Sequence, residues 1–347
     1  MKEQLASTHR YVPPTARARR RSFWWTAVVL ALLTPLAWLI NLPYFAASAG
    51  PTDDAVDAVI VEEDLAVFQP EGELILLTVS LQPVNLYEAA IAFFDQRIDL
   101  IERELLRPGG ETDEEARQRN LRAMDRSKDI AIAVALSELG LEETLAEGVE
   151  VVGVFHEAPA SDALVDGDLV VGMESQPVRT VEDIRRILED RRPGDEVQVT
   201  VIRDAEPTVL SFELHENPET PERAMVGITA STVYPIEIDS ANYGGPSAGM
   251  IYTLAIIDLL EQGELTDGRV VAGTGTISMD GSVGAIGGIR QKLVAAEAAG
   301  ADVVLVPRDN YDEASTAPVE VEIVAVESIS EAVSYLREGK SGIIEEQ

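Results

Sequence analysis

The sequence predicts a multidomain fold: an N-terminal transmembrane helix, a small mostly-β domain in the middle, and an α+β domain at the C-terminal end. Three observations predict it. A run of about twenty residues, Phe23–Leu42, carries no charge. Short strand patterns separated by Gly-Asp turns begin near Val149, and the last third alternates strand and helix patterns. The 347 residues suffice for two or three domains of about 100–200 residues each.

The charge balance limits the partners. The formal net charge is −34, from 27 basic and 61 acidic residues. Since so acidic a chain repels phosphate backbones, we expect no nucleic-acid partner. The sequence has no cysteine, which excludes thiol nucleophiles, thiolate metal sites and disulfides.

The uncharged run has the features of a single membrane span. Trp24 and Trp25 lie at its start, and a cluster of arginines, Arg17, Arg19, Arg20 and Arg21, precedes it. The positive-inside rule therefore places the N-terminus in the cytoplasm and the residues after 45 outside it, in a protein anchored in the cell membrane. The alternative is a cleaved signal peptide, because Ala47-Ser48-Ala49 offers small residues where a signal peptidase cuts.

The expected boundaries follow from these patterns. They are a basic cytoplasmic tail (1–22), the span (23–45), a linker with a strand and helical region (46–137), the mostly-β domain (138–217) and the α+β domain (218–347). Within the third segment we expect a solvated acidic linker at Gly50–Asp64, a strand at Glu73–Leu81, and helices at Tyr87–Leu106 and Glu114–Leu139. The strand either joins the C-terminal domain's sheet, which would make the mostly-β domain an insertion, or stays outside it.

The mostly-β region resembles a bacterial PDZ domain. The resemblance rests on Pro159-Ala160, Gly167-Asp168, Gln176-Pro177-Val178 and Gly194-Asp195 in that order, and covers residues 138–215. It implies capture of peptide ends by strand addition to a sheet edge. Leu139-Gly140-Leu141 is a weak candidate for the loop that holds a terminal carboxylate, and a plain small β-sandwich is the alternative fold.

One serine is placed where a nucleophile would work. Gly244, Gly245, Pro246 and Ser247 lead into an apolar helix from Met250 to about Leu260. Proline suits a first helical turn, and glycines permit a tight backbone whose N–H groups can hold an oxyanion. The alternative role for Ser247 is that of a helix cap.

The base for this serine is expected to be a lysine. The three histidines, His9, His156 and His215, give no metal-binding spacing and no convincing catalytic triad. Lys292, one of only four lysines, shares an apolar helix face with other residues of its segment, namely Ile289, Leu293 and Ala296. Burial there would favour the neutral amine that a general base requires, unless the side chain extends to solvent. We expect no metal and no cofactor.

Two motifs together resemble the Lon-type Ser-Lys peptidases. Gly244 to Gly249 is similar to that family's nucleophile motif, and the segment from Gly273 through Lys292 is similar to the one that carries its lysine. The resemblance, over residues 225–340, implies Ser247 as nucleophile, Lys292 as base and Thr274 as a hydroxyl that helps to orient the amine. Gly244 departs from the pattern, because the ATP-dependent members often have an acidic residue there.

The layout as a whole is similar to the membrane-anchored PDZ-containing Lon-like proteases. This similarity implies an ATP-independent serine endopeptidase whose partners are exported or envelope proteins and peptides, selected in part by the PDZ-like domain, and it permits a homo-oligomeric ring. Gly339-Lys340-Ser341 is no phosphate loop, because Ser334 stands where the earlier glycine is needed. The alternative function is a non-catalytic PDZ scaffold that binds the ends of envelope proteins.

Overall fold

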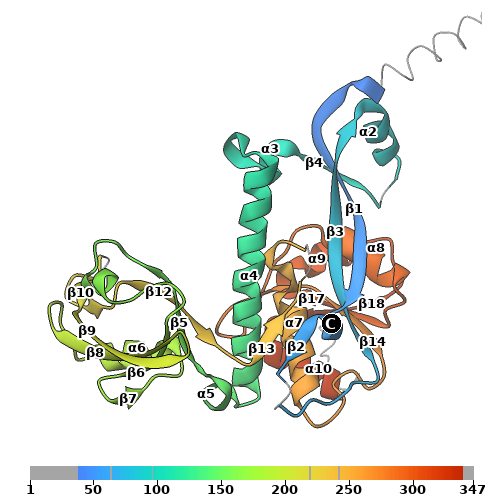
Figure 1. Ribbon diagram of the computed structural model, residues 1–347. Coiled ribbons are helices and arrows are strands. Elements are labelled where there is room, and N and C mark those ends of the chain that lie inside the picture. The colour runs from blue at the N-terminus through green and yellow to red at the C-terminus, as the bar shows by residue number, and fades with distance from the viewer. Residues whose placement is uncertain (1–37, 63–64, 96, 219, 241–242, 339–347) are drawn as a thin grey trace, which may run out of the picture. The chain divides into compact units, whose positions relative to one another are not determined.

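A computed structural model describes residues 38–62, 65–95, 97–218, 220–240 and 243–338 (Figure 1). The described chain forms two compact units. The smaller comprises residues 38–48 and 80–110, and the larger comprises 49–79 and 111–338. Most of the expected span, residues 23–37, lies outside the described part. Among the described residues, no helix is both long and apolar enough to cross a bilayer.

The smaller unit is built on the first half of β1 (Asn41–Asp54) and the end of β3 (Glu73–Asn85). The residues expected to end the span, 41–45, therefore belong to a strand. After β3 the chain forms the remaining elements of the smaller unit before it returns to the larger unit at residue 111. They are α2 (Leu86–Ala92), β4 (Asp99–Glu102), α3 (Arg103–Leu106) and the 3-10 turn η2 (Pro108–Gly110). The helix predicted over Tyr87–Leu106 is thus interrupted, because Asp99–Glu102 pairs with Tyr44–Ala47 as an antiparallel strand.

A mostly parallel sheet organises the larger unit. Its strands run in the order β18-β17-β14-β3-β1, with β14 at Val270–Gly273, β17 at Val303–Pro307 and β18 at Glu322–Val326. Residues Glu73–Leu76 of β3 pair in parallel with Val270–Gly273. The strand predicted at Glu73–Leu81 therefore belongs to this sheet, and the mostly-β domain is an insertion in it.

Helices cover both faces of the sheet. Because side chains alternate along a strand, Leu74 and Leu76 pack on one face, while Ile75 and Leu77 pack on the other. The first face is covered by α7 (Gly249–Leu260), α10 (Ile329–Glu338) and part of α4; the second is covered by α8 (Ile289–Ala298) and α9 (Tyr311–Ala314). The C-terminal domain is therefore a three-layer α/β arrangement around two apolar cores.

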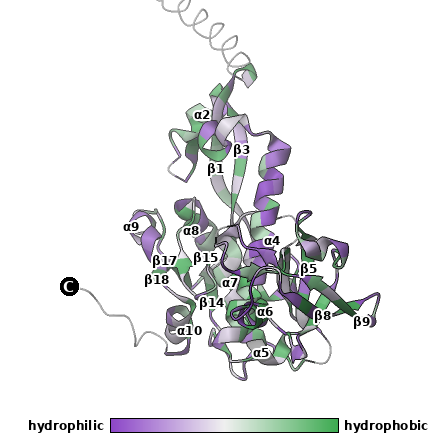
Figure 2. Ribbon diagram, turned by 90° about the vertical axis from the view of Figure 1, so that its left-hand side faces the viewer, coloured by the Kyte–Doolittle hydropathy of each residue, from purple (hydrophilic) through white to green (hydrophobic). Residues whose placement is uncertain are grey.

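The long helix α4 (Asp113–Glu138) confirms the helix predicted at Glu114–Leu139. Thr112 and Glu115 close a capping box at its start, and its first half is strongly hydrophilic (Figure 2). The second half is buried against α7 and joins the same core, through Ala131, Val134 and Ala135. Although α4 lies far from α7 in the sequence, it is part of the C-terminal domain.

The segment Gly50–Asp64, expected as a solvated linker, is structured over its described part. It contains the end of β1, a 3-10 turn (Val56–Ala58) and β2 (Val59–Val61). β2 pairs antiparallel with β13 (Ile236–Ile238), and Ala55 is buried in the core. The expectation of a linker was wrong because long-range strand pairing, which acidic composition does not reveal, fixes this segment.

The inserted domain is a sheet with strand order β12-β5-β6-β8-β9 and one short helix beside it. Its elements are β5 (Gly148–Val154), η3 (Pro159–Asp162), β6 (Leu169–Met173), β7 (Gln176–Pro177), α6 (Val181–Leu188), β8 (Glu196–Arg203), β9 (Glu206–Glu213), β10 (His215–Glu216), β11 (Ala224–Met225) and β12 (Ile228–Val233). It has its own core, which includes Val151, Val199 and Phe212. The sheet extends past the expected boundary at 217, since β12 forms its edge.

Leu139-Gly140-Leu141, the candidate for the carboxylate loop, ends α4 instead. Leu139 is the C-cap, Gly140 has φ +68°, and the N–H of Leu141 donates to the carbonyl of Leu136 at 2.7 Å. This pattern is a glycine-terminated helix end. α5 (Glu142–Leu145) follows it directly, so no strand begins there.

The fold predicts that residues 218–347 cannot form a domain alone. That fragment lacks β3, which lies inside the sheet, and α4, which covers one face of it. We expect the isolated fragment to show no cooperative thermal unfolding by circular dichroism, whereas a fragment of residues 49–347 unfolds cooperatively. A sharp unfolding transition in the 218–347 fragment would show that β3 and α4 are dispensable.

Candidate active site

The predicted nucleophile loop lies between β13 and α7. Gly245 has φ +96°, a conformation that favours glycine, and Pro246 opens the 3-10 turn η4 (Pro246–Ala248). Ser247 lies within this turn and is half-buried. Its side chain caps neither η4 nor α7. The alternative role of a helix cap for Ser247 is therefore wrong.

Close backbone approach explains the glycine at the start of α7. A Cβ atom on Gly249 would lie 2.4 Å from Cγ2 of Ile277 and 2.6 Å from Oγ of Ser127. Ile277 belongs to β15 (Thr276–Ile277), which pairs with β16 (Val283–Gly284) in a hairpin that turns through Asp280-Gly281. Gly249 thus allows the hairpin and α4 to approach the turn Gly244–Ala248, called the nucleophile turn, from two sides.

Lys292 reaches Ser247 from α8. Its Nζ lies 2.8 Å from Oγ of Ser247 and 2.8 Å from Oγ1 of Thr274, which follows the end of β14. The side chain of Lys292 is only 3% exposed, and Ile289 and Leu293 on the same helix are fully buried. The alternative in which Lys292 extends to solvent is therefore wrong.

Burial alone changes the protonation of this lysine. Removal from water disfavours the ammonium form and lowers the pKa of Lys292 to about 7. Such a lysine is substantially neutral at pH 7–8, where an ordinary lysine is almost fully charged. The amine can therefore accept a proton, which a general base must do.

Thr274 connects the lysine to the backbone of the nucleophile turn. It is fully buried, and its hydroxyl donates to the carbonyl oxygen of Ser247 at 3.1 Å. The N–H of Gly275 donates to the same oxygen at 2.9 Å. Both bonds hold the main chain of Ser247 against the end of β14, so that the distance from Ser247 to Lys292 is set by the sheet.

Two residues on α4, which the sequence analysis did not single out, hold the other side of the turn. Oγ of Ser127 donates to the carbonyl of Pro246 at 3.1 Å, and Ser127 is 3% exposed. The N–H of Gly245 donates to the carbonyl of Asn120 at 2.9 Å. No sequence signal could have revealed these contacts, because 119 positions separate Ser127 from Pro246.

The structure thus brings together Ser247, Lys292 and Thr274, with Gly244, Gly245 and Pro246 forming the turn before the serine. Gly244, which stands where the ATP-dependent members of the resembled family often have an acidic residue, is exposed and close to α4. A Cβ atom on it would lie 3.1 Å from Cβ of Asn120. Among the described residues no group of acidic residues and histidines could hold a metal ion.

Comparison with known proteins is consistent with this geometry. Residues 240–338 match the Lon protease (S16) C-terminal proteolytic domain, and residues 121–214 match the PDZ domain family. The chain is 40% identical over 97 residues to a Lon protease of Campylobacter concisus and 36% identical over 101 residues to one of Metamycoplasma arthritidis. These alignments cover 26% and 28% of this chain, but only 11% and 12% of the two relatives.

Solved PDZ domains resemble a quarter of the chain. The PDZ domains of SdrC-like proteins from Listeria monocytogenes and Listeria innocua are each 21% identical, with a TM-score of 0.23. The matches cover 24% of this chain and 87% and 93% of those domains. By the two family matches, the chain contains a PDZ domain and a Lon-type proteolytic domain, the latter a domain of serine peptidases.

Proposed function

We propose that this protein is an ATP-independent, membrane-anchored serine endopeptidase that uses Ser247 and Lys292 as a catalytic dyad. The observation that carries the proposal is the 2.8 Å contact between Nζ of a buried lysine and Oγ of the serine. A scaffold without activity would not require a buried amine at this position, since burying it costs stability. The contact therefore favours catalysis over the scaffold alternative.

The hydrogen bonds around the lysine define a direction for proton transfer. The hydroxyl of Thr274 donates its proton to the carbonyl of Ser247. Oγ1 of Thr274 therefore acts as an acceptor toward an N–H of Lys292. A neutral amine that donates to Thr274 can turn its lone pair toward the hydroxyl of Ser247. Lys292 then takes the Ser247 proton as Oγ attacks the peptide carbonyl, and returns it to the leaving amine. Water hydrolyses the resulting acyl-enzyme.

The first turn before α7 is suited to stabilise the oxyanion. The first N–H groups of a helix have no acceptor within it, and Pro246 has no N–H at all. We propose the backbone N–H groups of Ser247 and Ala248 as the donors. They lie on the same short turn as the nucleophile, so that no further segment is needed to complete the site.

Substrate selection is assigned to the PDZ domain. β12 forms the edge of its sheet, and α6 lies close enough for the N–H of Val181 to donate to Oγ1 of Thr232 at 3.1 Å. Gly227, with φ +85°, turns the chain into this strand. We propose that an extended peptide end adds to this edge. After β12 the chain continues through Tyr234 and Pro235 into β13 and the nucleophile loop.

The proposed cellular setting rests on the sequence. The arginine cluster before Phe23–Leu42 supports a cytoplasmic N-terminus and an extracytoplasmic catalytic domain. We propose that hydrolysis needs no ATP, as the similarity to the membrane-anchored PDZ-containing Lon-like proteases implies. Substrates would then be exported or envelope proteins and peptides that are already unfolded or flexible.

Substitution of the dyad tests the proposal. We expect Ser247→Ala and Lys292→Arg each to reduce hydrolysis of casein by a factor on the order of 10⁴ or more, without ATP in the assay. Lys128→Arg, a control at a half-buried lysine that pairs with the exposed Asp125, should retain activity. Unchanged hydrolysis in Ser247→Ala would refute the dyad, whereas peptide binding without any hydrolysis by the wild type would support the scaffold.

A second substitution tests the support from α4. Ser127→Ala removes the bond to the carbonyl of Pro246 but leaves every group of the dyad in place. Because a small displacement of a nucleophile is costly, we expect kcat to fall by about tenfold to 100-fold with little change in KM. The control is Ser137→Ala, at an exposed position of the same helix. Equal kcat values for the two variants would show that α4 does not position the nucleophile turn.

A further inference from the structure

The smaller unit has an apolar surface that its own core does not use. This surface, called the α2 apolar surface, comprises Leu86, Tyr87, Ile91, Phe93 and Phe94. Phe93 is 80% and Phe94 is 84% exposed, while the other three are exposed by 43% to 48%. The two phenylalanine rings contact each other edge to face, with centroids 5.4 Å apart. So many large apolar side chains in one short segment indicate an interaction site rather than chance exposure.

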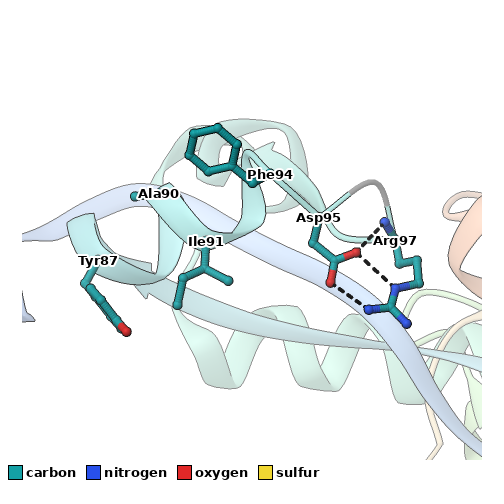
Figure 3. A pocket seen from close by; sticks show the side chains of 6 residues that line it. All are labelled: Tyr87, Ala90, Ile91, Phe94, Asp95 and Arg97. Atoms are coloured by element: carbon teal, nitrogen blue, oxygen red, sulfur yellow. Dashed lines mark hydrogen bonds and ion pairs between the residues drawn. The ribbon is translucent and has the colours of Figure 1, made fainter.

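The hollow in this surface carries no net charge. Tyr87, Ala90, Ile91 and Phe94 line it, and Asp95 and Arg97 complete its wall (Figure 3). Tyr87 and Ile91, one helical turn apart, point to the same side of α2 (Figure 3). Nε and Nη2 of Arg97 donate to the two carboxylate oxygens of Asp95, at 3.0 and 3.1 Å. The charges of the wall thus compensate each other.

The segment that carries the surface also differs from the rest of this acidic chain. From Ser80 to Phe94 the one charged residue is Glu88. Its carboxylate accepts from the N–H of Asn85 at 3.0 Å and so completes the capping box of α2. An apolar surface with few carboxylates can approach a lipid headgroup layer. The rest of the chain, whose full sequence has a net charge of −34, would be repelled by anionic headgroups.

The α2 apolar surface lies beside the end of the uncharged run Phe23–Leu42. The N–H of Leu86 donates to the carbonyl of Ile40 at 2.9 Å. Ile40 belongs to that run, and Trp38, Leu39 and Ile40 are themselves exposed, by 65%, 71% and 42%. The first residue of helix α2 is therefore hydrogen-bonded to a residue near the end of the run.

From this juxtaposition we infer that the α2 apolar surface inserts into the interfacial layer of the bilayer in which the run is anchored. Phe93, Phe94 and Ile91 would contact the upper acyl chains, and Tyr87 would lie at the headgroups, where aromatic residues are favoured. We favour the bilayer over a protein partner as the occupant of this surface, because anchoring of the run in the membrane would place α2 at the membrane surface. The inference rests on the membrane anchoring in the proposed function, but not on the dyad.

The absence of native cysteine permits a direct test on the full chain. Phe94→Cys is labelled with an environment-sensitive fluorophore, and the protein is reconstituted into phosphatidylcholine vesicles and isolated by flotation. The matched control is Val209→Cys in β9 of the PDZ domain, which is 58% exposed. We expect spin-labelled lipid to quench the probe at position 94 but not the probe at 209. Iodide in the aqueous phase should quench the probe at 94 several-fold less than the probe at 209.

Each contrary outcome has a distinct meaning. If the protein floats with the vesicles and iodide quenches both positions equally, the α2 surface does not insert, while anchoring stands. If the probe at 94 is protected from iodide and also from spin-labelled lipid, a second copy or another protein segment covers it, and the inference is wrong. A chain that does not float overturns anchoring and insertion together. Casein hydrolysis is measured separately and decides the dyad in all three cases.

Discussion

The proposed chemistry of this protein depends on the burial of one amine. The apolar residues of α8 and the sheet hold Lys292 out of water, with the oxygens of Ser247 and Thr274 as its neighbours. A pKa near 7 in the folded chain, against about 10.4 when unfolded, corresponds to a cost on the order of 5 kcal/mol. This penalty is complete below pH 7. The free energy of unfolding rises as the pH increases from about 7 to about 10.4, because in this interval Lys292 is protonated in the unfolded chain but neutral in the folded one. Proton affinity suited to a base is thus obtained at the expense of stability.

The elements around the amine hold the site in place despite this loss of stability. Thr274 and Gly275 follow β14, which lies between β3 and β17 inside the sheet, so their positions follow from strand pairing. On the opposite side, α4 holds the nucleophile turn through Ser127 and the backbone of Asn120. The serine is therefore fixed between a sheet and a long helix. This arrangement also explains why the proteolytic domain needs segments from both sides of the PDZ insertion.

The sequence predicted those features of the site that depend on local pattern. Gly245 and Pro246 revealed the turn, the spacing of Ile289, Lys292 and Leu293 revealed the buried face of α8, and the resemblance pointed to Thr274. It did not reveal features that depend on distant contacts. The pairing of β2 with β13 turned an expected acidic linker into structure, and the pairing of β4 with β1 interrupted an expected helix. Likewise, Ser127 gave no local signal of its contact with Pro246, and Gly140 suits a helix end as well as a peptide-binding loop.

The most direct measurement is an NMR titration of the lysine side chains. The chain has four lysines, Lys2, Lys128, Lys292 and Lys340, so that ¹³C-labelled lysine gives few signals, and Lys292→Arg identifies the one that matters. We predict that the Cε resonance of Lys292 titrates near pH 7. Titration of Lys292 near the ordinary lysine value of about 10.4 would contradict the account, because Lys292 would then be charged at neutral pH and unable to take the proton of Ser247.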